Sequence, residues 1–210
     1  DRVRNIVART NALSPDAVLL LGDYKAGYKL SHVSIRVPDT DIAKALSGLS
    51  APCGVHAVLG NHDDEKDVPT ALTSKGFTVL RDQRTQLTIK GERLDIAGIR
   101  FWTRGPADVA AALKGTSGNT ILIAHDPRRL VEAAALDVQL VLSGHTHGGQ
   151  VIVPGVGPVA GRKFPVLAGT GERGNTAIFV SRGVGTVYVP VRINCPPDVA
   201  VLTLRSATPA

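Results

Sequence analysis

Four of the six histidines in this chain follow short apolar runs, at the point where each run ends. Carboxylate and amide side chains share these positions. A mixture of imidazole and carboxylate groups suits zinc, iron, manganese, nickel or cobalt, and it argues against calcium. The pattern therefore predicts a transition-metal site. The segments are LLLGD with Asp23, AVLGNHD with Asn61, His62 and Asp63, ILIAHD with His125, and LVLSGHTH with His145 and His147.

The segment GHTHGG carries the strongest signal, because two histidines in a glycine-bounded loop do not fill a core. In an extended segment His145 and His147 would point to the same side and could serve two adjacent metal ions. The other segments have simpler interpretations when taken alone. GD is typical of a turn, and His125 fits a hydrogen-bonded core histidine equally well. Their recurrence in one order favours a shared site.

The elements that must position these residues follow from the apolar pattern, which predicts alternating strands and helices and then a β-rich closing portion. Polar strand ends meet if the strands are parallel neighbours, because the carboxyl ends of parallel strands line the ligand crevice. Helices are expected over 1–15, 39–49, 65–76, 106–115 and 128–136. Strands are expected over 16–23, 54–63, 119–127, 138–147, 177–183, 186–193 and 199–205, with a hairpin over 77–100.

The chain length and the alternation of strands and helices indicate one α/β domain over residues 1–210. Its composition, with 43% hydrophobic and 20% charged residues, is ordinary for a globular protein. No apolar run approaches the roughly 18 residues that span a bilayer. The net charge of +6 weakly favours an anionic partner. Because no basic run exceeds a pair, the sequence argues against a nucleic-acid binder. Cys53 and Cys195 lack a CxxC spacing and are expected to be free thiols.

The motifs GDY, GNHD, AHD and SGHTHGGQ, in this order, resemble the calcineurin-like metallophosphoesterase family. The resemblance covers nearly the whole chain. The later portion, from GHTHGGQVIVP to PVRINCPPDVAVLTL, is similar to a bacterial branch of predicted phosphohydrolases. The resemblance implies a four-layer α/β/β/α sandwich and a site for two transition-metal ions, drawn from Mn, Fe, Zn, Ni and Co.

The resemblance also implies a role for each site residue. It implies hydrolysis of a phosphomonoester, phosphodiester or pyrophosphate bond through a metal-bridging hydroxide. Asp23 would bridge both metals and His147 would bind the first. His62 would stabilise the transition state or protonate the leaving group, with Asp63 orienting its ring. The remaining ligands of the second metal would be Asn61, His125 and His145.

A small or lipid-linked phosphate ester is the expected substrate, and peripheral membrane association remains an open alternative. The glycine-rich segment 153–175 is expected to form loops over the crevice, where its basic residues could contact phosphate, although a solvated charged loop explains them too. His56 is expected to be structural. The candidate substrate contacts are Arg162, Lys163, Arg173 and His32.

The sequence departs from the family pattern at its first motif, Asp-x-His, which occurs nowhere in the 210 residues. The chain also contains no methionine. We therefore expect the strand that carries this motif to lie upstream of Asp1, where a signal or anchor would decide between cytoplasm and export. The first metal would keep only Asp23 and His147, so the second site is expected to be better formed. The alternative is a catalytically weakened metal-binding or scaffold protein of the same fold.

Overall fold

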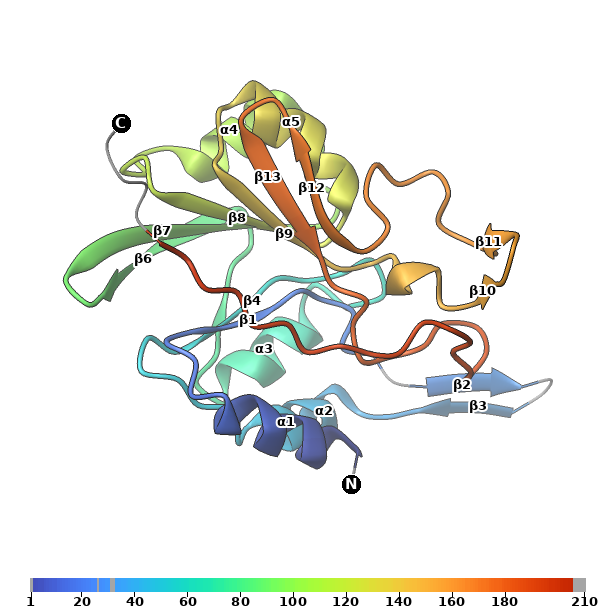
Figure 1. Cartoon of the computed structure of the whole chain (residues 1–210). Coiled ribbons are helices and arrows are strands. Elements are labelled where there is room, and N and C mark those ends of the chain that lie inside the picture. The colour runs from blue at the N-terminus through green and yellow to red at the C-terminus, as the bar shows by residue number, and fades with distance from the viewer. Residues whose placement is uncertain (1, 26, 31–32, 206–210) are drawn as a thin grey trace.

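The computed structural model describes residues 2–25, 27–30 and 33–205 of the chain. Two β-sheets lie between outer layers of helices (Figure 1). The helices are α1 (Arg2–Ala12), α2 (Asp39–Leu46), α3 (Asp67–Thr73), α4 (Pro106–Leu113) and α5 (Leu130–Ala135), with 3-10 turns η1 (Pro127–Arg129) and η2 (His147–Gly149). The strands are β1 (Val18–Leu20), β2 (Gly27–Leu30), β3 (Val33–Arg36), β4 (Val55–Ala57), β5 (Thr78–Val79), β6 (Gln83–Ile89), β7 (Glu92–Ile99), β8 (Thr120–Ala124), β9 (Leu140–Ser143), β10 (Ile152–Val153), β11 (Gly157–Pro158), β12 (Gly169–Arg173) and β13 (Thr176–Val180).

The larger sheet has six strands in the order β12-β13-β9-β8-β7-β6. The four central strands run parallel, and the two edge strands, β12 and β6, are antiparallel to their neighbours. Every residue of β8 is buried. Because side chains alternate between the faces of a strand, Leu122 and Ala124 pack with α4 and α5, while Ile121 and Ile123 face the other sheet.

The smaller sheet has three parallel strands in the order β1-β4-β5. Its outer face packs against α1, α2 and α3 through a core that includes Val7, Ala43 and Leu72. Its inner face meets the larger sheet, where Val58 joins Leu142 in a third buried cluster. These three clusters separate four layers. The predicted α/β/β/α sandwich is confirmed.

The four polar strand ends do not belong to one sheet. β1 and β4 pair in the smaller sheet, whereas β8 and β9 pair in the larger one. Their carboxyl ends meet because the two sheets pack face to face with these ends on the same side (Figure 1). The polar ends therefore meet without all four strands being neighbours in one sheet, because the packing of the two sheets brings the two pairs of strand ends together.

The last two expected strands, 186–193 and 199–205, do not form. Only one isolated bridge, between Val151 and Ile193, involves this part of the described chain. Pro190, Pro196 and Pro197 lack the N–H group that a ladder requires. The Gln150 side chain supplies bonds instead: its Nε2 donates to the carbonyls of residues 187 and 189, and its Oε1 accepts the N–H of residue 187.

The hairpin of β6 and β7 and the five helices match the sequence expectation in position. The hairpin of β2 and β3 was not predicted. Cys53 and Cys195 are free, as expected. No helix among the described residues is both long enough and apolar enough to cross a membrane.

Candidate metal centre

Three side chains from separate segments, Asp23, His125 and His145, lie close together. One potential ligand atom from each lies within 4.8 Å of the other two. The Nε2 atom of His125 is 3.1 Å from the Asp23 carboxylate and 3.1 Å from Nδ1 of His145. The Nδ1 atom of His125 bonds to the Leu21 carbonyl at 2.5 Å. A carbonyl only accepts, so this bond orients the ring with Nε2 toward the cluster, where that atom can carry a proton or bind a metal ion.

The close approach of two turns places Asp23 beside the end of β4. A side chain on Gly60 would meet the Asp23 carboxylate oxygen at 2.0 Å, and one on Gly22 would meet the Gly60 nitrogen at 2.5 Å. Glycine is therefore required at both positions. The main-chain N–H of His62 donates to this same carboxylate oxygen, Oδ1 of Asp23, at 3.0 Å.

Asp63 holds the two turns against each other. Its carboxylate accepts hydrogen bonds from the main-chain N–H groups of Gly60, Asp23 and Tyr24, at 2.7 to 2.8 Å. The sequence interpretation gave Asp63 the task of orienting the His62 ring. Among the described residues, the hydrogen bonds of this carboxylate go to main-chain groups, so the observed contacts indicate a structural role in shaping the site.

The two histidines after β9 do not lie in an extended segment, and that expectation is wrong. His145 has φ +70° and His147 has φ +52°, and η2 begins at His147. Asp23, at φ +60°, shares this left-handed conformation. Non-glycine residues rarely adopt it, and such strain gathers at functional sites. The two rings consequently separate, and His147 lies outside the three-residue cluster.

Two buried polar atoms next to the cluster lack a hydrogen-bond partner in the described chain: Oδ1 of Asn61 and Nδ1 of His147. An unpaired buried polar atom costs free energy of about 1–3 kcal/mol, so natural sites give it a partner. Both residues are predicted ligands, and amide oxygen and imidazole nitrogen are both metal donors. Asp23, His125 and His145 therefore fit a bound metal ion, and the unpaired amide oxygen of Asn61 is consistent with its predicted place as a fourth donor.

The charges of the cluster have opposite effects on metal binding near neutral pH. Burial opposes ionisation of Asp23, but the hydrogen bond and charge of His125 outweigh it and lower the Asp23 pKa to about 2. Burial and the neighbouring His125 charge lower the His145 pKa to about 4, so this ring is neutral at pH 7. Burial would also lower the pKa of His125, but its bond to Asp23 prevails and raises it. Binding of a cation at His125 therefore competes with a proton.

His62 follows Asn61 directly, and its side chain is exposed. Its ring makes no hydrogen bond to another described residue, while its main chain is fixed by Asp23. The ring is therefore free to contact a bound substrate. His56, by contrast, is buried and bonds to the Cys53 carbonyl at 2.8 Å, which confirms its structural role.

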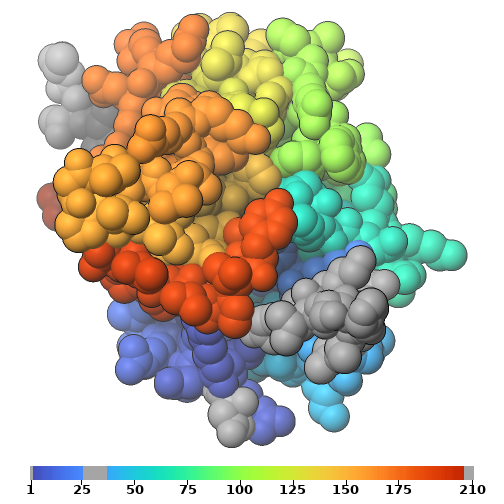
Figure 2. All heavy atoms as spheres, turned by 90° about the vertical axis from the view of Figure 1, so that its right-hand side faces the viewer, coloured from blue at the N-terminus to red at the C-terminus, as the bar shows by residue number. Residues whose placement is uncertain are grey.

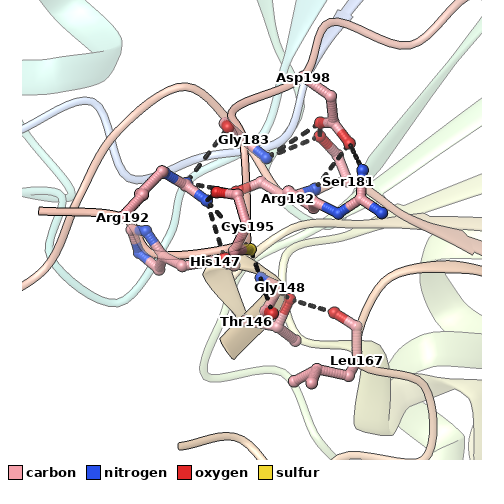
Figure 3. A network of polar contacts seen from close by, with 10 residues as sticks. All are labelled: Thr146, His147, Gly148, Leu167, Ser181, Arg182, Gly183, Arg192, Cys195 and Asp198. Atoms are coloured by element: carbon pink, nitrogen blue, oxygen red, sulfur yellow. Dashed lines mark hydrogen bonds and ion pairs between the residues drawn. The ribbon is translucent and has the colours of Figure 1, made fainter. Parts of the chain in front are cut away.

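Sequence reasoning missed Arg192, which holds the GHTHGG turn from a segment 45 residues later (Figure 3). Its guanidinium group donates to the His147 carbonyl at 2.9 Å. It also donates to the carbonyls of Arg182 and Gly185, each at 2.7 Å. Cys195 lies beside it, with Sγ 3.3 Å from the His147 carbonyl. In the sequence, nothing distinguished Arg192 from a solvated arginine.

Replacing Arg192 with glutamine should lower the free energy of unfolding by about 2 kcal/mol, because several carbonyls lose a charged donor. For a domain of this size that corresponds to a fall in Tm of about 4–8 °C. Thermal unfolding followed by circular dichroism measures the change. Arg4→Gln, on the exposed face of α1, is the matched control and should leave Tm unchanged. An equal Tm for both variants would contradict the role of Arg192.

The predicted substrate contacts have different surroundings. The loop after β11 reaches the site, because the ring of Phe164 lies 5.2 Å from that of His145. Lys163 lies beside it, with Nζ 5.5 Å from the Phe164 ring centre, whereas Arg162 bonds to carbonyls of its own loop. Arg173 ends β12 beside the start of β13, at the opposite end of the sheet from His145, which argues against phosphate contact there.

His32, the last of the candidate substrate contacts, lies outside the described residues.

On the face that carries the carboxyl ends of the strands, the loop around β10 and β11 lies next to the C-terminal segment (Figure 2). The two are joined by the hydrogen bond from the N–H of Ile152 to the carbonyl of Ile193.

Taken together, the paired sheets and the carboxylate–histidine cluster at their shared edge define an α/β/β/α protein with a candidate metal centre. The model of the family described as calcineurin-like phosphoesterase matches residues 1–149. The chain belongs to this family and is a phosphate-ester hydrolase of the metallophosphoesterase type.

Curated relatives match over nearly the whole chain. The metallophosphoesterase YkuE of Bacillus subtilis is 30% identical over 218 residues, which cover 97% of this chain and 73% of the relative. The phosphodiesterase YaeI of Escherichia coli is 32% identical, over 90% of this chain and 70% of the relative. A metallophosphoesterase of Aquifex aeolicus is 34% identical, over 98% of this chain and 78% of the relative.

Proposed function

We propose that the protein hydrolyses phosphodiesters in a site that holds two divalent metal ions. One observation carries this proposal: Asp23, His125 and His145 place ligand atoms within 4.8 Å of one another. The unpaired Oδ1 atom of Asn61 supplies a further donor. A relative named as a phosphodiesterase supports a diester as the substrate, and that name describes the relative alone.

Each residue has a separate task in this proposal. Asp23, Asn61, His125 and His145 would hold one metal ion, and Asp23 and His147 would contribute to the other. When bound, such ions lower the pKa of water and polarise the phosphoryl group. The exposed ring of His62 would meet the leaving oxygen and give it a proton. Asp63 and Arg192 would keep the two turns in place.

The direct test is hydrolysis of bis(4-nitrophenyl) phosphate by the protein expressed from its complete coding sequence. We expect turnover with added Mn²⁺ and loss of turnover after chelation, with recovery when Mn²⁺ is restored. Release of 4-nitrophenolate measures the rate. Mn²⁺ binding without hydrolysis of any diester or monoester would contradict the proposed function and favour a metal-binding protein of the same fold.

A further inference from the structure

An exposed aromatic side chain follows β7 at the same sheet edge as the metal cluster. β7 pairs in parallel with β8, and Ile99 lies opposite Ala124, so the chain leaves β7 beside His125. The ring of Phe101 then lies 5.4 Å from that of His145. Trp102 packs edge-on against Phe101 at 4.8 Å, yet 60% of its surface is exposed. The Phe101 ring therefore contacts both the indole of Trp102 and the ring of His145, a predicted metal ligand.

A cation lies over this indole. The guanidinium carbon of Arg104 is 5.3 Å from the Trp102 ring centre and 5.7 Å from that of Phe101. Among the described residues no carboxylate forms an ion pair with Arg104, so its charge can serve an anionic ligand. The carbonyl of Arg104 accepts a hydrogen bond from Arg129 at 3.0 Å, which fixes the loop. The pair of side chains is thus held in place while remaining accessible.

The mechanism leaves both groups unused. The proposed centre accounts for the phosphoryl group and the leaving oxygen, but a phosphodiester has a second substituent that must lie beyond the histidines. An exposed indole with a guanidinium group over it is suited to stack a planar ring next to a negative charge. Neither stacking by Trp102 nor the positive charge of Arg104 depends on a residue that is a predicted metal ligand.

We propose that Trp102 and Arg104 form a subsite for the second substituent of the substrate. The inference rests on the proposed function and names its substrate class: phosphodiesters in which that substituent carries a planar aromatic or heteroaromatic ring, such as an aryl or nucleoside group. Trp102 stacks on the ring of the substituent, and the guanidinium group of Arg104 contributes a positive charge next to it. A diester with a small alkyl substituent gains nothing from the subsite.

Two diesters with the same leaving group test this subsite. Bis(4-nitrophenyl) phosphate and methyl 4-nitrophenyl phosphate both release 4-nitrophenolate and differ only in the retained substituent. Trp102→Ala should raise KM for the aryl diester about 5-fold, with kcat and the methyl diester unaffected, as expected for lost binding alone. Trp102→Phe should retain most of the affinity. Leu13→Ala, which removes an exposed apolar group directly after α1, is the control.

Fluorescence gives a measurement that does not depend on turnover. Trp102 is the single tryptophan of the chain. Diphenyl phosphate should shift or quench its emission in the metal-free protein, whereas dimethyl phosphate at the same concentration should not. An unchanged KM for the aryl diester in Trp102→Ala, or an equal rise for both diesters, would overturn the subsite alone. Wild-type protein that binds metal but cleaves neither diester would overturn the proposed function, and the substrate class with it.

Discussion

Asp23→Asn is expected to reduce kcat/KM for bis(4-nitrophenyl) phosphate by about 1,000-fold or more. Bound metal ions supply several kcal/mol of transition-state stabilisation, and each 1.36 kcal/mol is tenfold in rate. Asp23 is the carboxylate of the cluster, and its pKa of about 2 keeps it ionised throughout the neutral range. Asparagine preserves the shape and the bond from the His62 N–H but removes the charge that attracts the cation.

Calorimetric titration with Mn²⁺ separates this explanation from misfolding. The variant should show weakened Mn²⁺ binding at an unchanged circular dichroism spectrum. Asp41→Asn, an exposed acid of α2, removes the same charge away from the site and should bind Mn²⁺ like the wild type. If Asp23→Asn binds Mn²⁺ with wild-type affinity, Asp23 is not a ligand and the proposed centre is wrong.

The sequence predicts the parts of this site that depend on short segments. Each polar motif follows an apolar run, and a buried strand is the local structure that such a run favours. LLLGD and AVLGNHD each contain a glycine, and only the structure explains why. A side chain on Gly60, the glycine of AVLGNHD, would overlap the Asp23 carboxylate. Residue type and spacing were sufficient to find Asp23, His125 and His145.

The remaining features depend on contacts between distant segments. Nothing local indicates that β1 and β4 belong to a different sheet from β8 and β9, since all four runs have the same pattern. The left-handed conformations at His145 and His147 arise where the C-terminal segment crosses the turn. Gly148 has no room for a side chain there, because Cys195 Sγ would lie 2.8 Å from it. The apolar alternation over 186–193 predicts a strand, but Gln150 binds that segment instead.

The predicted metal ligands come from two different sheets, so the geometry of the site depends on how the sheets pack. Asp23 and Asn61 come from the smaller sheet, and His125 and His145 from the larger one. A small shift of one sheet against the other would therefore change the distances between ligands. Asp63 and Arg192 act against such shifts within each half, while the buried cluster that includes Val58 and Leu142 joins the two sheets. Packing of an apolar core thus sets the geometry of a polar site.

His62→Asn is expected to lower kcat by about 100-fold for phenyl esters while leaving the Mn²⁺ content unchanged, because general acids contribute about that much. The loss should be smaller for 4-nitrophenyl esters, whose leaving oxygen needs little help from a proton. Rates for both esters and the bound metal measured by mass spectrometry test the role together. An equal loss for both leaving groups would exclude proton donation by the exposed His62 ring and leave only stabilisation of phosphoryl charge. A loss of bound Mn²⁺ would instead place His62 among the metal ligands.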